Sequence, residues 1–354
     1  MLRSLMASGP LLSRRLVDAI AACVALLYLA VYANARALLP EFIFRDADKI
    51  ETQIGGGATY DGTSFDAVGR FYQTLGNAGT SVFVAALGVL FIWLALRQTR
   101  RAGSLYANLV LIAPCLFFNL FVASKDTLVV LIAVLLAWVA RRCGTVRTLA
   151  AAVVLYAGYA AFIRSYFVLI VLCAGGAWAF RRVPVLLKVI GLLLLGAALI
   201  ALPDAVYFLL QHPRDMAVDY LVYESPFGAR TSFYNPYPPD SFVHFVGNYA
   251  YSVVRLNLPI LFSFDVKGLA MQGFIAFVLA SAWRRVAPTA GTGTASLRGG
   301  EALACLVLGH VAVSMLFEPD LGSYTRHLSS VALFVAVLWP LRTARGSAAA
   351  VRPA

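Results

Sequence analysis

The sequence predicts an all-α protein, a polytopic transmembrane helical bundle of about ten spans with two long extracytoplasmic loops. Hydrophobic residues make up 61% of the 354 positions and charged residues only 13%, unlike a water-soluble globular domain. The apolar residues fall into blocks of roughly 14 to 20, close to the length that crosses a bilayer as a helix. Strands of a membrane barrel would instead show short segments of alternating polarity.

The predicted spans follow one another along the chain, which we treat as a single integral membrane domain over residues 1–354. They cover about 16–33, 80–96, 105–123, 127–140, 148–163, 165–180, 183–202, 268–283, 302–317 and 328–341. Four of them are short for a membrane helix, as expected where helix ends line a protein-bounded cavity rather than lipid.

Arginine clusters occupy every second connection, and the positive-inside rule places these connections in the cytoplasm. They are Arg14 and Arg15; Arg97, Arg100 and Arg101; Arg141, Arg142 and Arg147; Arg181, Arg182 and Lys188; Arg284 and Arg285; and Arg342 and Arg345. Both chain termini are therefore expected in the cytoplasm. One alternative concerns the start, where the basic pair, the apolar run 19–32 and Ala33-Asn34-Ala35 also resemble a cleavable secretory signal.

The two long outer connections lie at about 34–79 and about 203–267 and are too polar to sit in lipid. The second is rich in aromatic residues and proline. Its segment 242–264 is apolar enough to touch the membrane but includes polar residues, so we expect it to be interfacial or re-entrant. Because the inner connections are short, function is expected in the helices and the outer loops.

Composition and motifs exclude several classes of protein. The net charge of +12 comes from short clusters between apolar blocks, which does not indicate a nucleic-acid partner. The sequence has no Walker loop, no Rossmann glycine pattern, no zinc-protease motif and no serine-hydrolase elbow. A nucleotide-driven pump and a soluble-type hydrolase are therefore disfavoured, and we expect no metal and no cofactor.

Charged residues at the outer ends of the spans are the candidate functional residues, since a charge there is costly unless paired or used. Lys125 and Asp126 lie in the short connection between the third and fourth spans. Asp126 is suited to cap the helix that it begins, and Lys125 to bind an anionic lipid phosphate. Arg164 is flanked by apolar sequence, so it forms an internal ion pair, reaches the headgroups or grips a phosphate bidentately.

The last outer turn, from Glu318 to His327, concentrates acids, an arginine and a histidine beside two apolar spans. Glu318, Asp320 and His327 are candidate catalytic bases, and Arg326 is a candidate substrate-binding cation. An ordinary charged turn has the same composition, and nothing in the sequence chooses among the three bases. We expect this turn to face Arg164 across a cavity that opens to the outer surface.

Aromatic residues interleaved with polar ones in the second long loop suit sugar rings, which offer an apolar face and a hydroxyl rim. They equally suit a loop resting on lipid headgroups. Arg230 and Arg255 are the candidate substrate-binding residues of this loop. His310 lies within a span, where a histidine is more often packed and hydrogen-bonded than a ligand.

Three segments carry a family resemblance: Ser124-Lys125-Asp126 before a Leu/Val-rich helix, the isolated Arg164, and Leu321-Gly322-Ser323-Tyr324-Thr325-Arg326-His327 before a span ending in Trp339-Pro340. With the outer loops, they resemble bacterial polysaccharide polymerases of the Wzy and EpsG kind, which make O-antigen or exopolysaccharide. The resemblance implies a metal-independent, inverting glycosyltransferase at the periplasmic face of the inner membrane. It would join oligosaccharide repeat units carried on undecaprenyl pyrophosphate.

The resemblance also implies roles for particular residues. Arg164 and Arg326 would hold the pyrophosphate, with Lys125, Arg230 and Arg255 behind them. Asp320, Glu318 or His327 would accept the proton of the acceptor hydroxyl, while the arginines stabilise the leaving pyrophosphate. The implied partners are the lipid-linked oligosaccharide, membrane lipid, a chain-length regulator and a flippase, and no nucleic acid.

Two other functions stay open: a transporter or flippase of lipid-linked sugars, and an accessory protein of an envelope polysaccharide assembly complex. A transporter places ionisable groups near the middle of its spans, whereas the charges here collect at the outer edge. An accessory protein need not bring its charges together. The placement of the polar residues therefore discriminates among the three.

Overall fold

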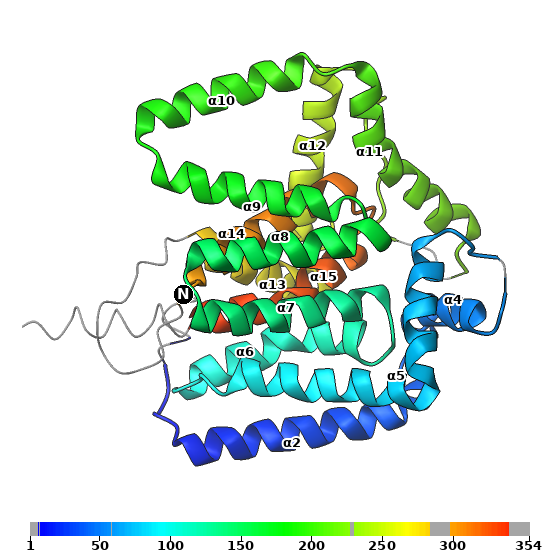
Figure 1. Ribbon diagram of the computed structural model, residues 1–354, viewed down its shortest axis with the longest axis vertical. Helices are drawn as coiled ribbons and strands as arrows, with labels where there is room; N and C mark the ends of the chain where they lie inside the picture. The colour runs from blue at the N-terminus through cyan, green and yellow to red at the C-terminus, as the bar shows by residue number, and fades with distance from the viewer. Residues whose placement is uncertain (1–5, 7, 58, 227–229, 284–297, 340–354) are drawn as a thin grey trace, which may run out of the picture.

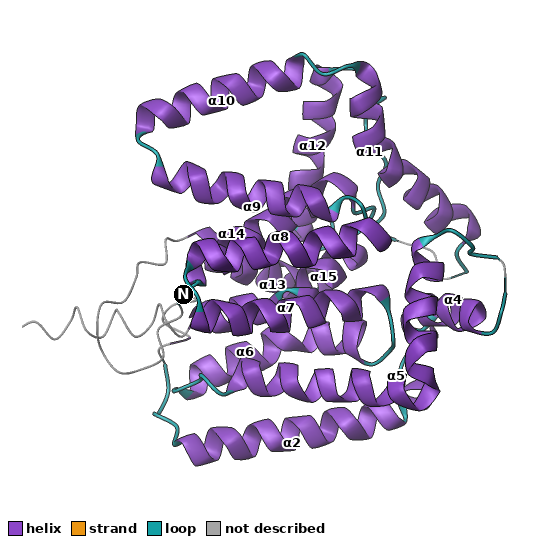
Figure 2. Ribbon diagram, viewed as in Figure 1, coloured by secondary structure: helices purple, strands orange, loops and turns teal. Residues whose placement is uncertain are grey.

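The computed structural model describes residues 6, 8–57, 59–226, 230–283 and 298–339. These residues fold into helices joined by turns, with no β-strand among them (Figure 2). The all-α class predicted from the sequence is confirmed. The predicted cytoplasmic residues Arg284, Arg285, Arg342 and Arg345 and the end of the last predicted span, at 340–341, lie outside the described residues.

Most of the helices lie side by side in one bundle (Figure 1). Its members are α2 (Arg14–Ala33), α5 (Ser64–Leu96), α6 (Ala102–Cys115), α7 (Lys125–Arg142), α8 (Thr145–Phe162), α9 (Phe167–Arg182), α13 (Val266–Trp283), α14 (Gly300–Phe317) and α15 (Leu321–Ser330). A π-helical turn over Leu116–Leu120 prolongs α6 just after Pro114, which cannot donate a backbone hydrogen bond.

The centre of the bundle is α14, most of whose residues are buried. It packs against α8, α9, α13 and α15. At Gly309 the backbones of α14 and α9 touch, because a Cβ there would lie 2.3 Å from the carbonyl oxygen of Ile170. Only glycine allows so close an approach of two helices.

The helices that are long and apolar enough to cross a membrane number six among the described residues, or up to eight if each of two bent helix pairs is one span. One bent pair is α15 with Ala332–Trp339, at an angle of 56°. Each predicted span falls on a helix within the described residues, but α9 has only 16 residues and α7 carries charges at both ends. The chain is thus an integral membrane protein by composition, and the count of ten spans stays a prediction.

The two long outer segments contain helices where the sequence indicated loops. Residues 34–79 hold α3 (Ala35–Leu38), a 3₁₀ turn (Glu41–Ile43), α4 (Arg45–Ile54) and the start of α5, which is kinked at Gly76 with a φ of 67°. Residues 203–267 hold α11 (Asp204–Asp219), a π-helical turn (Tyr220–Glu224), α12 (Phe242–Asn257) and a 3₁₀ turn (Pro259–Leu261). Only part of each segment is irregular.

Capping and amphipathic spacing explain why α12 forms in a segment expected to lie at the interface. The Ser241 side chain accepts a hydrogen bond from the His244 backbone and begins the helix. Its buried residues Asn248, Ser252 and Leu256 are four positions apart, so they share one face. That face packs toward α11 and α14, while the other residues of α12 are exposed or half-buried, so α12 is a helix attached to the protein by one face.

The hydrophobic helix α10 (Val185–Ile200) stands away from the bundle (Figure 1). None of its residues is buried, and a bend of 90° separates it from α11. Since its exposed side chains are almost all aliphatic, lipid is the medium that they suit.

The bundle has two chemically different ends. We name the α4 end as the one where α4 lies and where α7, α9 and α15 begin, on the right of Figure 1. We name the arginine-rich end as the one where α5, α7 and α9 finish at Arg97, Arg142 and Arg182. By the positive-inside rule the α4 end is expected outside the cytoplasm.

The ten-span topology can be tested with reporter fusions. Fusions after Arg101, Arg142 and Arg182 should report the cytoplasm, and fusions near Asp61 and Asp240 should report the periplasm. A pair of reporters with opposite compartment requirements, one active in each compartment, provides the internal control. A periplasmic signal at Arg182 would contradict the topology.

Candidate functional site

The central feature of the α4 end is a buried carboxylate shared by two arginines. Arg164, in the connection between α8 and α9, donates to Asp126 at 3.0 Å. Arg326 on α15 is paired with Asp126 and also donates to Asp46 on α4. The Asp126 side chain is only 2% exposed, so it needs this pairing to stay ionised in the protein interior.

Local sequence fixes the position of Asp126. Ser124 caps α7 by accepting from the Thr127 backbone, and the Thr127 hydroxyl accepts from the Ser124 backbone in return. The Tyr72 hydroxyl from α5 donates to the Ser124 carbonyl oxygen at 2.9 Å. Asp126 therefore sits in the first turn of α7, where the helix dipole favours a negative charge.

The carboxylate of Asp46 brings the outer segment into the same network. Burial alone would raise the pKa of this carboxyl, but the neighbouring Arg326 and Lys125 outweigh burial and hold it well below its usual range. Asp46 is therefore ionised. The pair that it forms with Arg326 ties α4 to α15 across a wide separation in sequence.

Beside this network lies a cavity of about 730 Å³. Its charged lining comprises five cations, Arg45, Lys49, Lys125, Arg164 and Arg326, and three carboxylates, Asp46, Asp126 and Glu318. Another part of the lining is apolar and comes from the first turn of α9, from α11 and from Phe317. With neutral histidine, positive charges exceed negative ones by two, so the cavity is suited to an anion that carries apolar surface.

Three cations of the lining, Arg45, Lys49 and Lys125, form no ion pair with a carboxylate of the described residues. The ammonium nitrogens of Lys49 and Lys125 lie 5.1 and 4.1 Å from the centre of the same Phe65 ring. Lys49 also donates to the Tyr220 hydroxyl at 3.0 Å. Aromatic faces thus hold both lysines at the cavity without neutralising them.

The last outer turn contributes an acid and a histidine to the cavity. The Nδ1 atom of His327 lies 3.1 Å from Glu318 Oε1 and 2.7 Å from the Ser314 hydroxyl. Burial alone would raise the pKa of Glu318, but the hydrogen bond to His327 and the charges nearby keep it below its usual value. The other ring nitrogen of His327, Nε2, is buried without a hydrogen-bond partner.

A second buried histidine lies behind the first. His310 Nε2 is 2.8 Å from the Tyr156 hydroxyl, and the rings of His310 and His327 have centroids 5.2 Å apart. Its Nδ1 atom has no partner. The sequence-based interpretation of His310 as a packed, hydrogen-bonded residue agrees with this contact to Tyr156.

The structure gathers five of the eight residues predicted from the sequence. Lys125, Arg164, Glu318, Arg326 and His327 all line the cavity. The turn that begins at Glu318 therefore does face Arg164, since Arg164 and Arg326 share one carboxylate.

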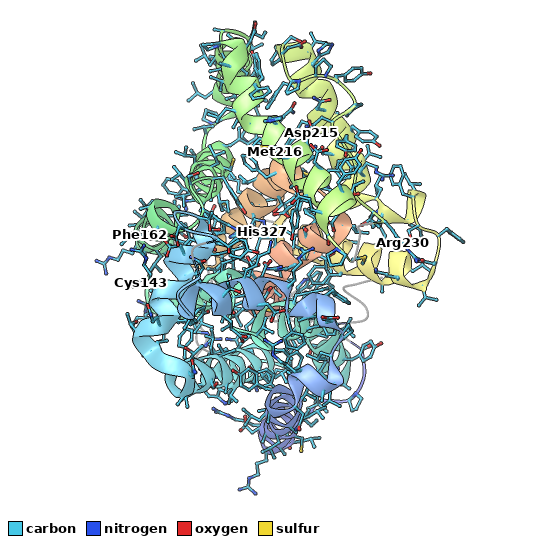
Figure 3. All side chains as sticks on the ribbon, turned by 90° about the vertical axis from the view of Figure 1, so that its right-hand side faces the viewer. Cys143, Phe162, Asp215, Met216, Arg230 and His327 are labelled. Atoms are coloured by element: carbon cyan, nitrogen blue, oxygen red, sulfur yellow. The ribbon has the colours of Figure 1, made fainter. Side chains whose placement is uncertain are left out.

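Asp320, Arg230 and Arg255 do not line this cavity. Asp320 caps α15 by accepting from the backbone and the hydroxyl of Ser323, both at 2.9 Å. The Arg255 guanidinium lies over the Phe262 ring at 4.2 Å. Arg230 is exposed, and Figure 3 shows it toward the edge of the molecule while His327 is central.

Sequence reasoning missed the contribution of α4 and Phe65. Arg45 and Lys49 are four residues apart, which places both on one face of a helix, with Asp46 beside Arg45. This spacing indicates a shared face only if the segment is a helix, and residues 34–79 were expected to form a loop. Recognising a short helix there would have placed its cations on one face.

Removal of the shared carboxylate tests the importance of the network for folding. Asp126→Ala leaves two buried guanidiniums with one partner fewer, which should lower stability by about 3 kcal/mol and lower the melting temperature in detergent. The matched control is Glu51→Ala, which removes a carboxylate from an exposed pair with Arg36 and should change little. Equal melting temperatures for the two variants would contradict the stated importance of Asp126.

Comparisons with protein-family models, with curated proteins and with solved structures found no match for this chain. The features that indicate a function are therefore those of the cavity: its position at the α4 end, its surplus of positive charge, its apolar wall and its histidine–glutamate pair.

Proposed function

We propose that this chain is a membrane glycosyltransferase that polymerises oligosaccharide units carried on undecaprenyl pyrophosphate. The reaction takes place at the periplasmic face of a bacterial inner membrane, and both chain termini lie in the cytoplasm. The observation that carries the proposal is the cavity at the α4 end, which combines surplus positive charge with an apolar wall. A pyrophosphate attached to a hydrocarbon chain matches both properties.

The cations suit the leaving group of this reaction. As the bond between the anomeric carbon and the phosphate oxygen breaks, negative charge develops on the pyrophosphate. Arg164 and Arg326 are already held in place by Asp126, so they stabilise that charge without reorganisation. Arg45, Lys49 and Lys125, which form no ion pair among the described residues, supply the charge that the two aspartates leave unbalanced.

The acceptor hydroxyl needs a base, and the contacts favour His327 among the three candidates. Asp320 is occupied as the cap of α15. Glu318 is ionised and lies beside Nδ1 of His327, which favours the tautomer with the proton on Nδ1. Nε2 is then the proton acceptor, and because it is buried, the proposed mechanism requires the His327 ring to turn toward the cavity when the acceptor binds. In this mechanism Nε2 takes the hydroxyl proton as the hydroxyl oxygen forms the new bond to the anomeric carbon.

The apolar part of the lining comes mainly from α9 and α11, the helices before and after α10 in the chain. Val168 and Leu169 belong to α9, and Leu209 and Leu210 belong to α11. The lipid chain of the substrate would lie along this wall, with its phosphates at the arginines. The aromatic rings of Tyr166 and Phe317, stacked 4.9 Å apart in the same lining, offer an apolar face to a sugar ring.

One observation favours the alternative, a flippase or transporter. His310 is fully buried within α14 and lies beside His327, so ionisable groups extend from the cavity toward the middle of a span. The two functions differ in which side of the membrane holds the uncombined repeat units when the protein fails.

Substitutions of Arg164 test whether the cavity binds pyrophosphate. Arg164→Ala should abolish polymer while the protein stays in the membrane, and single lipid-linked repeat units should accumulate on the periplasmic side. Arg164→Lys should restore little activity, because a lysine cannot bind a phosphate bidentately. Arg230→Ala, which removes an exposed arginine that does not line the cavity, is the matched control and should retain activity.

Polymer length on gels and the side of accumulation, measured with a membrane-impermeant label, decide the outcome. Normal polymer in the Arg164→Ala variant would remove this residue from the site. Accumulation of repeat units on the cytoplasmic side would favour the flippase.

The base prediction compares residues of the last outer turn. His327→Ala should lower the polymerisation rate by about 10²-fold or more, the usual contribution of a general base. Glu318→Gln should lower the rate less and change its dependence on pH, because the charge that orients His327 is lost. Asp320→Asn, which keeps a capping side chain, should have little effect on the rate. A larger loss in Asp320→Asn than in His327→Ala would assign the base to Asp320 instead.

A further inference from the structure

The arginine-rich end brings together cations that the proposed reaction does not use. Arg97 follows the last residue of α5 and Arg141 lies in the last turn of α7, and Gln98, the residue after Arg97, contacts Arg141. The Gln98 side chain, with its amide oriented by its hydrogen-bonding partners, accepts from two Arg141 nitrogens at 2.8 and 3.2 Å. Since α5 and α7 pack together, the two guanidiniums lie at one corner of the bundle.

No carboxylate of the described ranges compensates these charges. Six arginines of the two neighbouring connections lack an ion pair: Arg97, Arg100, Arg101, Arg141, Arg142 and Arg147. By contrast, Arg182 at the same end lies 2.7 Å from Glu301. Close like charges with no counter-charge are unfavourable unless an anion from outside the chain joins them.

A tryptophan lies one helical turn before an arginine at the end of both α5 and α7. The Arg97 guanidinium lies 4.0 Å from the centre of the Trp93 ring, and that of Arg142 lies 3.9 Å from Trp138. The two tryptophans are 41% and 53% exposed, as is typical of residues at the headgroup level. Stacking on the ring covers one face of a guanidinium and leaves its N–H edge free to donate.

We propose that the corner formed by the C-terminal ends of α5 and α7 binds the phosphate group of an anionic phospholipid. Arg97 and Arg141 donate to the phosphate oxygens, and the lipid glycerol and upper acyl chains lie against Trp93 and Trp138. A phospholipid fits better than free phosphate, because the cations border an exposed apolar surface. An anionic lipid fits better than phosphatidylcholine, which brings a positive charge of its own.

The test compares purified protein variants in detergent with added lipid. Wild type should show a melting temperature about 3 °C higher with phosphatidylglycerol than with phosphatidylcholine at equal concentration. The variant Arg97→Gln/Arg141→Gln should lose this difference. The matched control is Arg182→Gln, which removes an arginine that also stacks on a tryptophan, Trp178, but is neutralised by Glu301. It should keep the difference.

A second measurement tests the proposal if the double variant folds poorly. In the folded fraction, mass spectrometry of retained lipid should show the ratio of phosphatidylglycerol to phosphatidylcholine falling at least about fivefold, and the single variant Arg97→Gln should fall between. Equal stabilisation by the two lipids in wild type would overturn the proposal. So would an unchanged ratio in the double variant, or the same stabilisation by millimolar inorganic phosphate without lipid.

Discussion

The α4 end of the protein depends on one buried carboxylate. Asp126 holds Arg164 and Arg326, which come from segments far apart in the sequence, and Arg326 in turn holds Asp46. None of these groups would be tolerated singly in the interior of a membrane protein, because each would have to give up its hydration without a replacement. The site and the packing of three segments are thus consequences of the same ion pairs.

This interdependence gives the cavity two kinds of cation. Arg164 and Arg326 are fixed by carboxylates and have defined orientations, so they suit the recognition of a group with directional oxygens. The two lysines and Arg45 lie by aromatic rings and form no ion pair among the described residues, so they contribute charge more than direction. A lipid pyrophosphate requires both, since it must be oriented at the bond that breaks and neutralised as a whole.

Sequence alone predicted what depends on local pattern. Runs of apolar residues predicted the helices. Polar side chains beside those runs indicated five residues that line the cavity, because a charge at the end of a span is costly unless it is paired or used: Lys125, Arg164, Glu318, Arg326 and His327. The partners of those charges were not predictable in the same way. That Asp126 joins two arginines depends on how α7, α8, α9 and α15 pack, and the periodicity of a helix carries no information about its neighbours.

The three candidate bases show the same distinction. Nothing in the sequence distinguishes Asp320, Glu318 and His327 as candidate bases. The structure shows that Asp320 caps a helix, whereas Glu318 and His327 line the cavity. Conversely, residues 45–54 have one aliphatic residue per turn, but this face is too short for the sequence to distinguish a helix from a loop. Helix capping and tertiary contacts determine both the roles of these three residues and the helical structure of residues 45–54.

The contact of α9 and α14 at Gly309 has a consequence for the width of the cavity. Val168 and Leu169 of the lining directly precede Ile170, the residue that Gly309 contacts, whereas Glu318 of the lining lies just beyond the end of α14. Gly309 lies nine residues before Glu318, about 13 Å along the helix axis. A methyl group at position 309 would therefore push α14 away from the first turn of α9, and the displacement would reach the cavity directly at the wall that Val168 and Leu169 form.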